Sequence, residues 1–344
     1  MITAIDFGCF AIRSAWRADP PNSGIMMHSA QSEYVVLPNI EQHRQLLDAH
    51  GISRAECEDS IVVYGNQAER ARWLSRTPSA GIFNGGMVPV DDPPARQILD
   101  LLTASMLPEP SGHGNLCAFT IPGSQRRNES QEFLARLISM RGFEPLPVSA
   151  ADAAMLAEGS ESTFTGFAIV MGAETTEVSL FRLGVTLASN ILPVGADWVD
   201  MELARQFKVQ IWDESGDAWL DLGAVREWKH HPDRHLSSAS GGREKVFGQL
   251  NSAVLAKVAQ SIRQQLLLPD VQLILPDDRL NVVCCGGATQ AAGFTSALTG
   301  RFVDHDIAGR IQSVRAVDNP AQTVIRGLLI AAELESRRRT HAAA

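Results

Sequence analysis

The sequence has little of what marks several large classes of protein. Its five cysteines form neither a regular spacing nor a Cys-x-x-Cys pair, which excludes a disulfide framework and a cysteine-ligated zinc site. Its 30 Lys and Arg are outnumbered by 39 Asp and Glu, which gives a formal net charge of −9. We therefore expect no nucleic-acid partner, because phosphate contacts need clustered positive charge.

The sequence also has no apolar run of membrane-spanning length, and it opens with a strand-like stretch, MITAIDFG, rather than with a signal peptide. We expect a cytoplasmic protein without an integral membrane segment. At 344 residues, with 45% hydrophobic and 20% charged side chains, the chain is long enough for two globular domains of average size.

Apolar, β-prone runs alternate with helical patterns along the chain. The runs predict strands within 2–8, 11–17, 33–40, 60–66, 116–123, 167–181 (a strand, a turn and a strand), 184–195 and 280–287. The stretch 145–159 predicts a strand that passes into an Ala-rich helix ending at Gly159. Helical patterns predict further helices at about 65–75, 93–106, 124–141, 198–207, 244–267, 288–299 and 320–337.

This order of elements indicates an α/β protein with two halves, each beginning with a β-meander. The first half covers residues 1–158 and is completed by the final helix at 320–337, the second covers 159–319, and 338–344 form a polar tail. A polar, poorly patterned insert lies at 212–243. Its HHPDRH stretch holds three histidines, but no carboxylate or cysteine completes a metal-binding spacing, so we favour an exposed loop.

Three glycine-bearing turns each follow an apolar strand: DFGC at 6–9, GAETT at 172–176 and CGGA at 285–288. Glycine lets the backbone turn tightly, and consecutive amides in such turns attract anions. The third turn is predicted to open a helix, whose N-terminal amides add partial positive charge. Each turn alone is equally typical of an ordinary hairpin or strand–helix junction.

The order and spacing of these motifs resemble those of the actin superfamily, which includes the bacterial actin MreB, FtsA, PilM, DnaK-type chaperones and sugar kinases. AIDFG resembles the first phosphate loop of that family, and IVMGAETTEVSLF resembles the second, which usually reads DIGGGTTEV. VVCCGGATQAAG resembles the adenosine motif, and PLPVSAADAAMLAEG lies where the family has its first connecting helix. The chain length is that of an MreB-like protein, whereas the degenerate motifs are similar to those of FtsA and PilM.

The resemblance implies an actin-like fold of two ribonuclease-H-like α/β domains with a nucleotide cleft between them. It also implies ATP with Mg²⁺ as the ligand, and Asp6 as the acid that orients the metal through water. The residues implied for nucleotide binding are Asp6, Gly8, Cys9, Phe10, Gly172, Ala173, Glu174, Thr175, Thr176, Gly286, Gly287 and Ala288.

Two positions depart from the family pattern. Val170 stands where the second loop usually has its acid, and Ala150 stands where the connecting helix usually presents Glu or Gln. Neither side chain can hold a metal-bound water, and loss of a water-positioning group costs roughly 10² to 10⁴ in rate. Asp152 is expected to turn away from the site along its helix, and Glu174 is expected to face bound phosphate and repel it. Whether Ser149, Asp152 or Glu177 replaces a lost group is left open by the sequence.

Three functions follow from the resemblance. The first is an actin-like cytoskeletal or scaffold protein with weak or lost ATP hydrolysis, which binds copies of itself head-to-tail. The second is a pseudo-ATPase adaptor of the FtsA or PilM type, which acts through other protein partners. The third is a small-molecule kinase, for which Asp91 or Asp92 would have to serve as the base.

Overall fold

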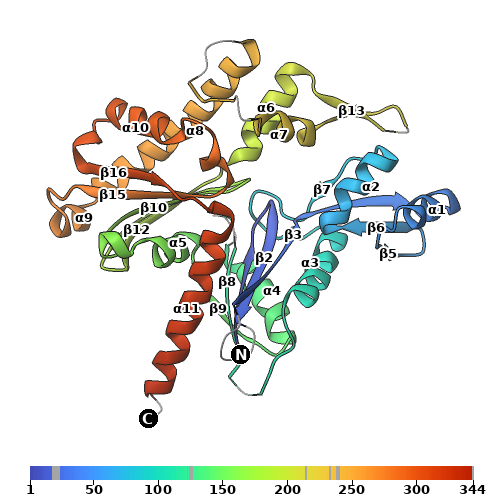
Figure 1. Cartoon of the computed structure of the whole chain (residues 1–344), viewed down its shortest axis with the longest axis horizontal. Coiled ribbons are helices and arrows are strands. Elements are labelled where there is room, and N and C mark those ends of the chain that lie inside the picture. The colour runs from blue at the N-terminus through green and yellow to red at the C-terminus, as the bar shows by residue number, and fades with distance from the viewer. Residues whose placement is uncertain are drawn as a thin grey trace.

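The computed structural model describes residues 1–17, 24–112, 114–121, 123, 127–213, 215–231, 234–237 and 241–342. The start of the predicted helix at 124–141 and part of the HHPDRH stretch lie outside the described residues. Two halves of similar architecture, each with a large twisted sheet, lie side by side (Figure 1). The predicted α/β architecture is confirmed.

The first half is built on a five-stranded sheet. In spatial order its strands are β3 (Ile25–Gln31), β2 (Ala11–Arg17), β1 (Ile2–Phe7), β8 (Leu116–Thr120) and β9 (Glu144–Pro147). The first three form an antiparallel meander, and β8 and β9 are added parallel to β1. Helices α3 (Pro93–Met106) and α4 (Arg127–Met140) bury their apolar side chains against this sheet in one core.

The second half repeats this plan. Its sheet has the order β12 (Val185–Leu192), β11 (Thr176–Arg182), β10 (Gly166–Met171), β15 (Leu280–Cys285) and β16 (Ile311–Ala316). Again a meander is followed by two parallel strands. Helices α6 (Ala196–Phe207), α8 (Gly242–Leu266), α9 (Pro269–Ile274) and α10 (Phe294–Asp304) contribute to its core.

Each half also carries a smaller lobe. The first lobe has strands β4 (Glu33–Pro38), β5 (Ala55–Glu56), β6 (Ser60–Tyr64) and β7 (Ala80–Gly81), and helices α1 (Glu41–Ala49) and α2 (Ala68–Ser75). The insert at 212–243, for which the sequence predicts no elements, contributes to the second lobe. This second lobe contains the strand pair β13 (Gln210–Trp212) and β14 (Ala218–Leu220) and helix α7 (Leu222–Lys229).

Two helices, α5 (Ala150–Glu158) and α11 (Pro320–Ala342), connect the halves. They belong to one apolar cluster that also contains residues of both large sheets, and much of this cluster is alanine. Figure 1 shows α11 passing α5 and then extending away from the body. Because alanine has a single methyl group, the Ala-rich pattern lets these helices approach closely, as small residues do at helix contacts.

Two of the predicted helices differ from the structure. The helix expected at 288–299 is split into a short 3₁₀ helix, Gly287–Gln290, and α10, which begins at Phe294. Ala291, which caps the first segment, has extended backbone angles, and Gly293, the N-cap of α10, has φ of +85°, outside the helical region. The final helix continues to Ala342, past its expected end at 337. Within the described residues, no helix has both the length and the apolar character of a membrane span.

The contact between α5 and α11 generates a prediction. A Cβ on Gly327 would overlap the carbonyl of Ala153 in α5, so Gly327→Ala should push the helices apart and lower the free energy of unfolding by roughly 1 to 3 kcal/mol. A Cβ on Gly300 in α10 would meet no other atom. Gly300→Ala should therefore raise the free energy of unfolding by about 0.5 to 1 kcal/mol through helix propensity. Urea unfolding of both variants checks this. Equal effects would mean that the α5–α11 contact is not tight.

Candidate functional site

A cavity of about 360 Å³ lies between the two halves. We call it the cleft cavity. This volume falls in the range of small-molecule sites. All of the predicted nucleotide-binding residues except Thr176 line it. Thr176 is instead buried in β11, where its hydroxyl donates to the carbonyl of Val194 at 2.8 Å.

The first two turns occupy equivalent places in the two halves, each joining the first two strands of a meander. The second turn is closed by a hydrogen bond from the Gly172 amide to the Thr175 carbonyl at 2.9 Å. Among the described residues, the amides at 8–10 and 173–175 make no backbone hydrogen bond. Successive free amides at a cavity wall are a feature of anion-binding turns.

The third turn packs directly on the second sheet. Gly286 has φ of +99°, and a side chain there would overlap the carbonyl of Met171 at the end of β10. Only glycine allows this approach. The turn is held by the Thr289 hydroxyl, which donates to the Gly286 carbonyl at 2.8 Å.

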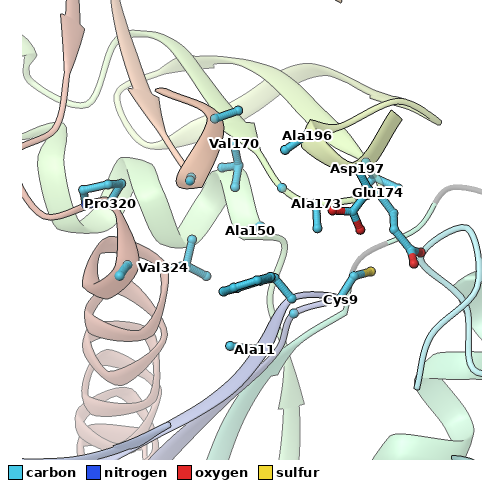
Figure 2. Close-up of a pocket in the computed structure, with 18 of the residues that line it drawn as sticks. Cys9, Ala11, Ala150, Val170, Ala173, Glu174, Ala196, Asp197, Pro320 and Val324 are labelled. Carbon is cyan, nitrogen blue, oxygen red and sulfur yellow. The ribbon is translucent and has the colours of Figure 1, made fainter. Parts of the chain in front are cut away.

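The middle of the cleft cavity is lined by methyl groups. Figure 2 shows Val170, Ala150, Ala11 and Val324 around it, whereas the carboxylates of Glu174 and Asp197 and the thiol of Cys9 gather at one side. Val170 and Ala150 therefore face the cavity at the two positions where the resemblance implies polar groups.

Asp6 lines the cavity from β1, and its side chain is 13% exposed. The register of the hairpin places Arg13 of β2 directly opposite, with 3.8 Å between Nη1 and the carboxylate. Burial raises the pKa of Asp6 to about 6, and the positive charge of Arg13 opposes this rise only in part. Arg13 was missed by the sequence analysis, although the length of the turn fixes its register with Asp6.

Glu177 occupies in the second half the place that Arg13 has in the first half, on the second strand of the meander. It pairs with Val170 across β10 and β11, is 6% exposed and lines the cleft cavity. Paired residues of neighbouring strands project from the same face of a sheet. A carboxyl group is thus present one strand away from the position where the family pattern places it.

Glu174 does not point into the middle of the cavity, contrary to expectation. Its carboxylate accepts a hydrogen bond from the Gly86 amide of the first half at 2.5 Å (the carboxylate is seen at the edge of the cavity in Figure 2). Burial raises the pKa of Glu174, and this amide and the Cys9 thiol oppose the rise. Burial and the neighbouring Glu174 carboxyl raise the pKa of Cys9, so its thiol stays protonated at neutral pH.

Two further basic side chains of the cavity are already paired. Arg226 of α7 donates to Asp197 at 3.0 Å and lies 3.5 Å from Asp200. Lys229 donates to Asp200, which is 1% exposed, at 2.6 Å. Burial raises the pKa of Asp200, and Lys229 opposes the rise. These residues form an ion-paired wall between α6 and α7.

Ser149 and Asp152 are committed to helix capping rather than to the cavity. Ser149 caps α5 by accepting from the Asp152 amide at 2.9 Å, and its hydroxyl donates to the Asp152 carboxylate at 2.5 Å. The other Asp152 oxygen accepts from Thr186 at 2.7 Å. Neither residue lines the cleft cavity, as the helical geometry predicted for Asp152.

A buried ion pair joins the two smaller lobes. Arg72 of α2 donates to Asp221, the N-cap residue of α7, at 2.9 Å, with side chains 8% and 10% exposed. The Arg226 guanidinium also lies 5.3 Å from the centroid of the Phe10 ring in the opposite half. The halves thus contact each other at several points around the cavity.

The residues present fit a nucleotide better than they fit its metal. The free amides and the Thr120 hydroxyl, which is buried without a hydrogen-bond partner beside Asp6, can serve phosphate oxygens. For Mg²⁺, however, the second acid is replaced by Val170, and Asp6 already faces a guanidinium. Within the described residues, no group of three acidic, His or Cys side chains could hold a metal ion, the HHPDRH histidines included.

The two candidate kinase bases, Asp91 and Asp92, do not line the cleft cavity. Asp92 caps α3 by accepting from the Ala95 amide at 3.0 Å, and it accepts from the Tyr34 hydroxyl at 2.6 Å. Asp91 and Asp92 line a different groove between the 83–92 segment and α4. Their positions favour a structural role.

The chain has the fold of the actin-like superfamily. A profile of the family described as Volactin matches residues 1–332, and the chain belongs to this family. A comparison with curated protein sequences finds no match.

Three solved structures share the fold over nearly the whole chain. MamK in a double helical filament has a TM-score of 0.68 and 15% identity, and the match covers 96% of this chain and 98% of MamK. MreB5 of Spiroplasma citri bound to AMPPNP has a TM-score of 0.69 and 12% identity, with 99% and 98% covered. The ethanolamine utilization protein EutJ from Carboxydothermus hydrogenoformans has a TM-score of 0.54 and 15% identity, with 96% and 89% covered.

The raised pKa of Asp6 generates a pH prediction. Because the folded state holds this proton more tightly than the unfolded state does, wild-type stability should fall as pH rises from about 4 to about 6. The difference between the ordinary value of 3.8 and about 6 corresponds to roughly 3 kcal/mol at neutral pH. Asp6→Asn should therefore be more stable than wild type at pH 7.5 and equal to it near pH 4, as measured by urea unfolding. A difference that is constant with pH would contradict this.

The ion pair between the lobes generates a second prediction. Arg72→Met leaves the buried Asp221 carboxylate without its cation and should lower the free energy of unfolding by roughly 3 kcal/mol. Adding Asp221→Asn should recover most of this loss, because Asn removes the charge and still caps α7. Denaturant titration of the single and double variants measures both effects. A double variant no more stable than Arg72→Met would show that the buried charge is not the cause.

Proposed function

We propose that this chain is an actin-like scaffold that assembles head-to-tail into filaments and holds a nucleotide in its cleft without hydrolysing it efficiently. The observation that carries this proposal is a cleft lined by three glycine-bearing turns, with Val170 and Ala150 at the two positions where the resemblance implies polar groups. Methyl groups cannot position the attacking water or a hydrated metal. The turns support binding, and the methyl groups argue against turnover.

Filament formation is supported by the extent of the structural likeness. MamK, which matches over nearly its full length, was solved as a double helical filament. A head-to-tail contact uses two different surfaces of each subunit, so it does not close and produces an open polymer.

The proposal predicts that the protein forms polymers but releases phosphate from ATP only slowly. Purified protein should sediment and form filaments visible by electron microscopy above a critical concentration. Phosphate release should be about 100-fold or more below that of a hydrolysing actin-like protein assayed alongside, because the water-positioning group is absent. A strictly monomeric protein at high concentration would overturn the filament proposal. Phosphate release comparable to that of the control would overturn the loss of hydrolysis.

A second candidate is a pseudo-ATPase adaptor that acts through other protein partners. It is favoured by the contacts across the cleft, above all that between Glu174 and Gly86, which join the halves through groups of the chain itself. Such a protein could serve as a rigid platform. A monomer in sedimentation that is recovered with a defined protein partner would favour the adaptor, whereas polymers of the purified chain alone would favour the scaffold.

A further inference from the structure

Among the cations of the cleft cavity, Arg13 differs in how it is bound. Its guanidinium is 3.8 Å from the Asp6 carboxylate, which is beyond hydrogen-bond distance. In the described part of the chain, Arg13 has no hydrogen-bond acceptor, whereas Arg226 and Lys229 donate to acids at 3.0 and 2.6 Å. Arg13 is also only 24% exposed, so its charge is partly shielded from water. Its donors are available to a ligand in the cavity.

The position of Arg13 is fixed by the backbone. It faces Asp6 across the β1–β2 pair, immediately behind the first anion-binding turn, and both side chains line the cavity. A guanidinium presents a planar fork of N–H donors that matches two phosphate oxygens. Attraction to Asp6 keeps the fork at this wall without using its donors.

The same position disfavours a divalent cation. A metal oriented by Asp6 would lie close to a fixed guanidinium, and like charges at such distances repel strongly in a partly buried site. On the opposite wall Val170 has methyl groups where the second acid is expected, and the Glu177 carboxyl lies one strand away from that position. Arg13 offers a positive charge at this wall that does not come from a metal ion.

We propose that the cleft binds the phosphate chain of a nucleotide without a divalent cation, and that Arg13 provides the positive charge that replaces the metal. This inference rests on the proposed nucleotide binding and specifies how the ligand is held. It reverses the role that the resemblance implies for Asp6. In a metal-dependent site Asp6 helps to bind the nucleotide, whereas here it competes with the phosphates for Arg13.

The test is calorimetric titration with ATP at pH 7.5, in EDTA and in Mg²⁺, on wild type and three variants. Wild-type affinity in EDTA should lie within about threefold of that in Mg²⁺. Arg13→Met should weaken binding by roughly tenfold to a hundredfold, because charge-assisted hydrogen bonds are lost. Asp6→Asn should tighten binding several-fold in EDTA. Arg17→Met is the matched control, because Arg17 lies on the same strand but pairs with Glu333 outside the cavity.

Each outcome decides the inference. A loss of affinity of more than tenfold in EDTA, or weaker binding by Asp6→Asn, would overturn it in favour of a metal site. Equal effects of Arg13→Met and Arg17→Met would also overturn it. Circular dichroism checks that the variants are folded. The comparison of ATP affinity in EDTA and in Mg²⁺ uses wild type alone, so it does not depend on how any variant folds. Absence of ATP binding in both buffers would overturn it too, while sedimentation of the same protein reports separately on filament assembly.

Discussion

The close contact between α5 and α11 is the constraint on which the rest of the structure depends. Gly327 lies against the Ala153 backbone, and the alanines around it let both helices pack between the two sheets. This packing sets the distance between the halves. Since the first two turns come from different sheets, only that distance brings them to one cavity, with the ends of α5 and α11 as its floor. The cleft cavity is thus a consequence of helix packing rather than of any one motif.

Around this fixed floor, the cleft is held by contacts of the chain with itself. Glu174 binds the Gly86 amide beside the cavity, and Arg72 binds Asp221 between the smaller lobes. Breaking either contact would leave a buried or half-buried charge without its partner, which is costly in a medium of low polarity. A cleft joined in this way depends less on a ligand to hold its two halves together. The contact with Gly86 explains how the second turn accommodates Glu174.

Much of the fold could be predicted because local patterns and the tertiary structure agree. Helix α3 has the predicted bounds because Asp92 caps it and Pro93 and Pro94 can only begin a helix. Strand β3 was missed because its residues, IMMHSAQ, are mostly exposed and lack a clear alternation. The start of α10 was misjudged because Gly293 was not taken as a helix break.

Cavity residues could be predicted where their place depends on local sequence order. They could not be predicted where their place depends on contacts between distant parts of the chain. The three turns, Val170 and Ala150 were found from their place after strands. The contact between Glu174 and Gly86 joins residues 88 positions apart, and no local pattern carries it. Arg13 lies between these cases, because its pairing with Asp6 follows from the register of one hairpin. Counting residues outward from the turn on both strands would have paired Arg13 with Asp6. Motif comparison passed it over because a motif records the residues expected at a site, whereas cross-strand geometry also reveals unexpected ones.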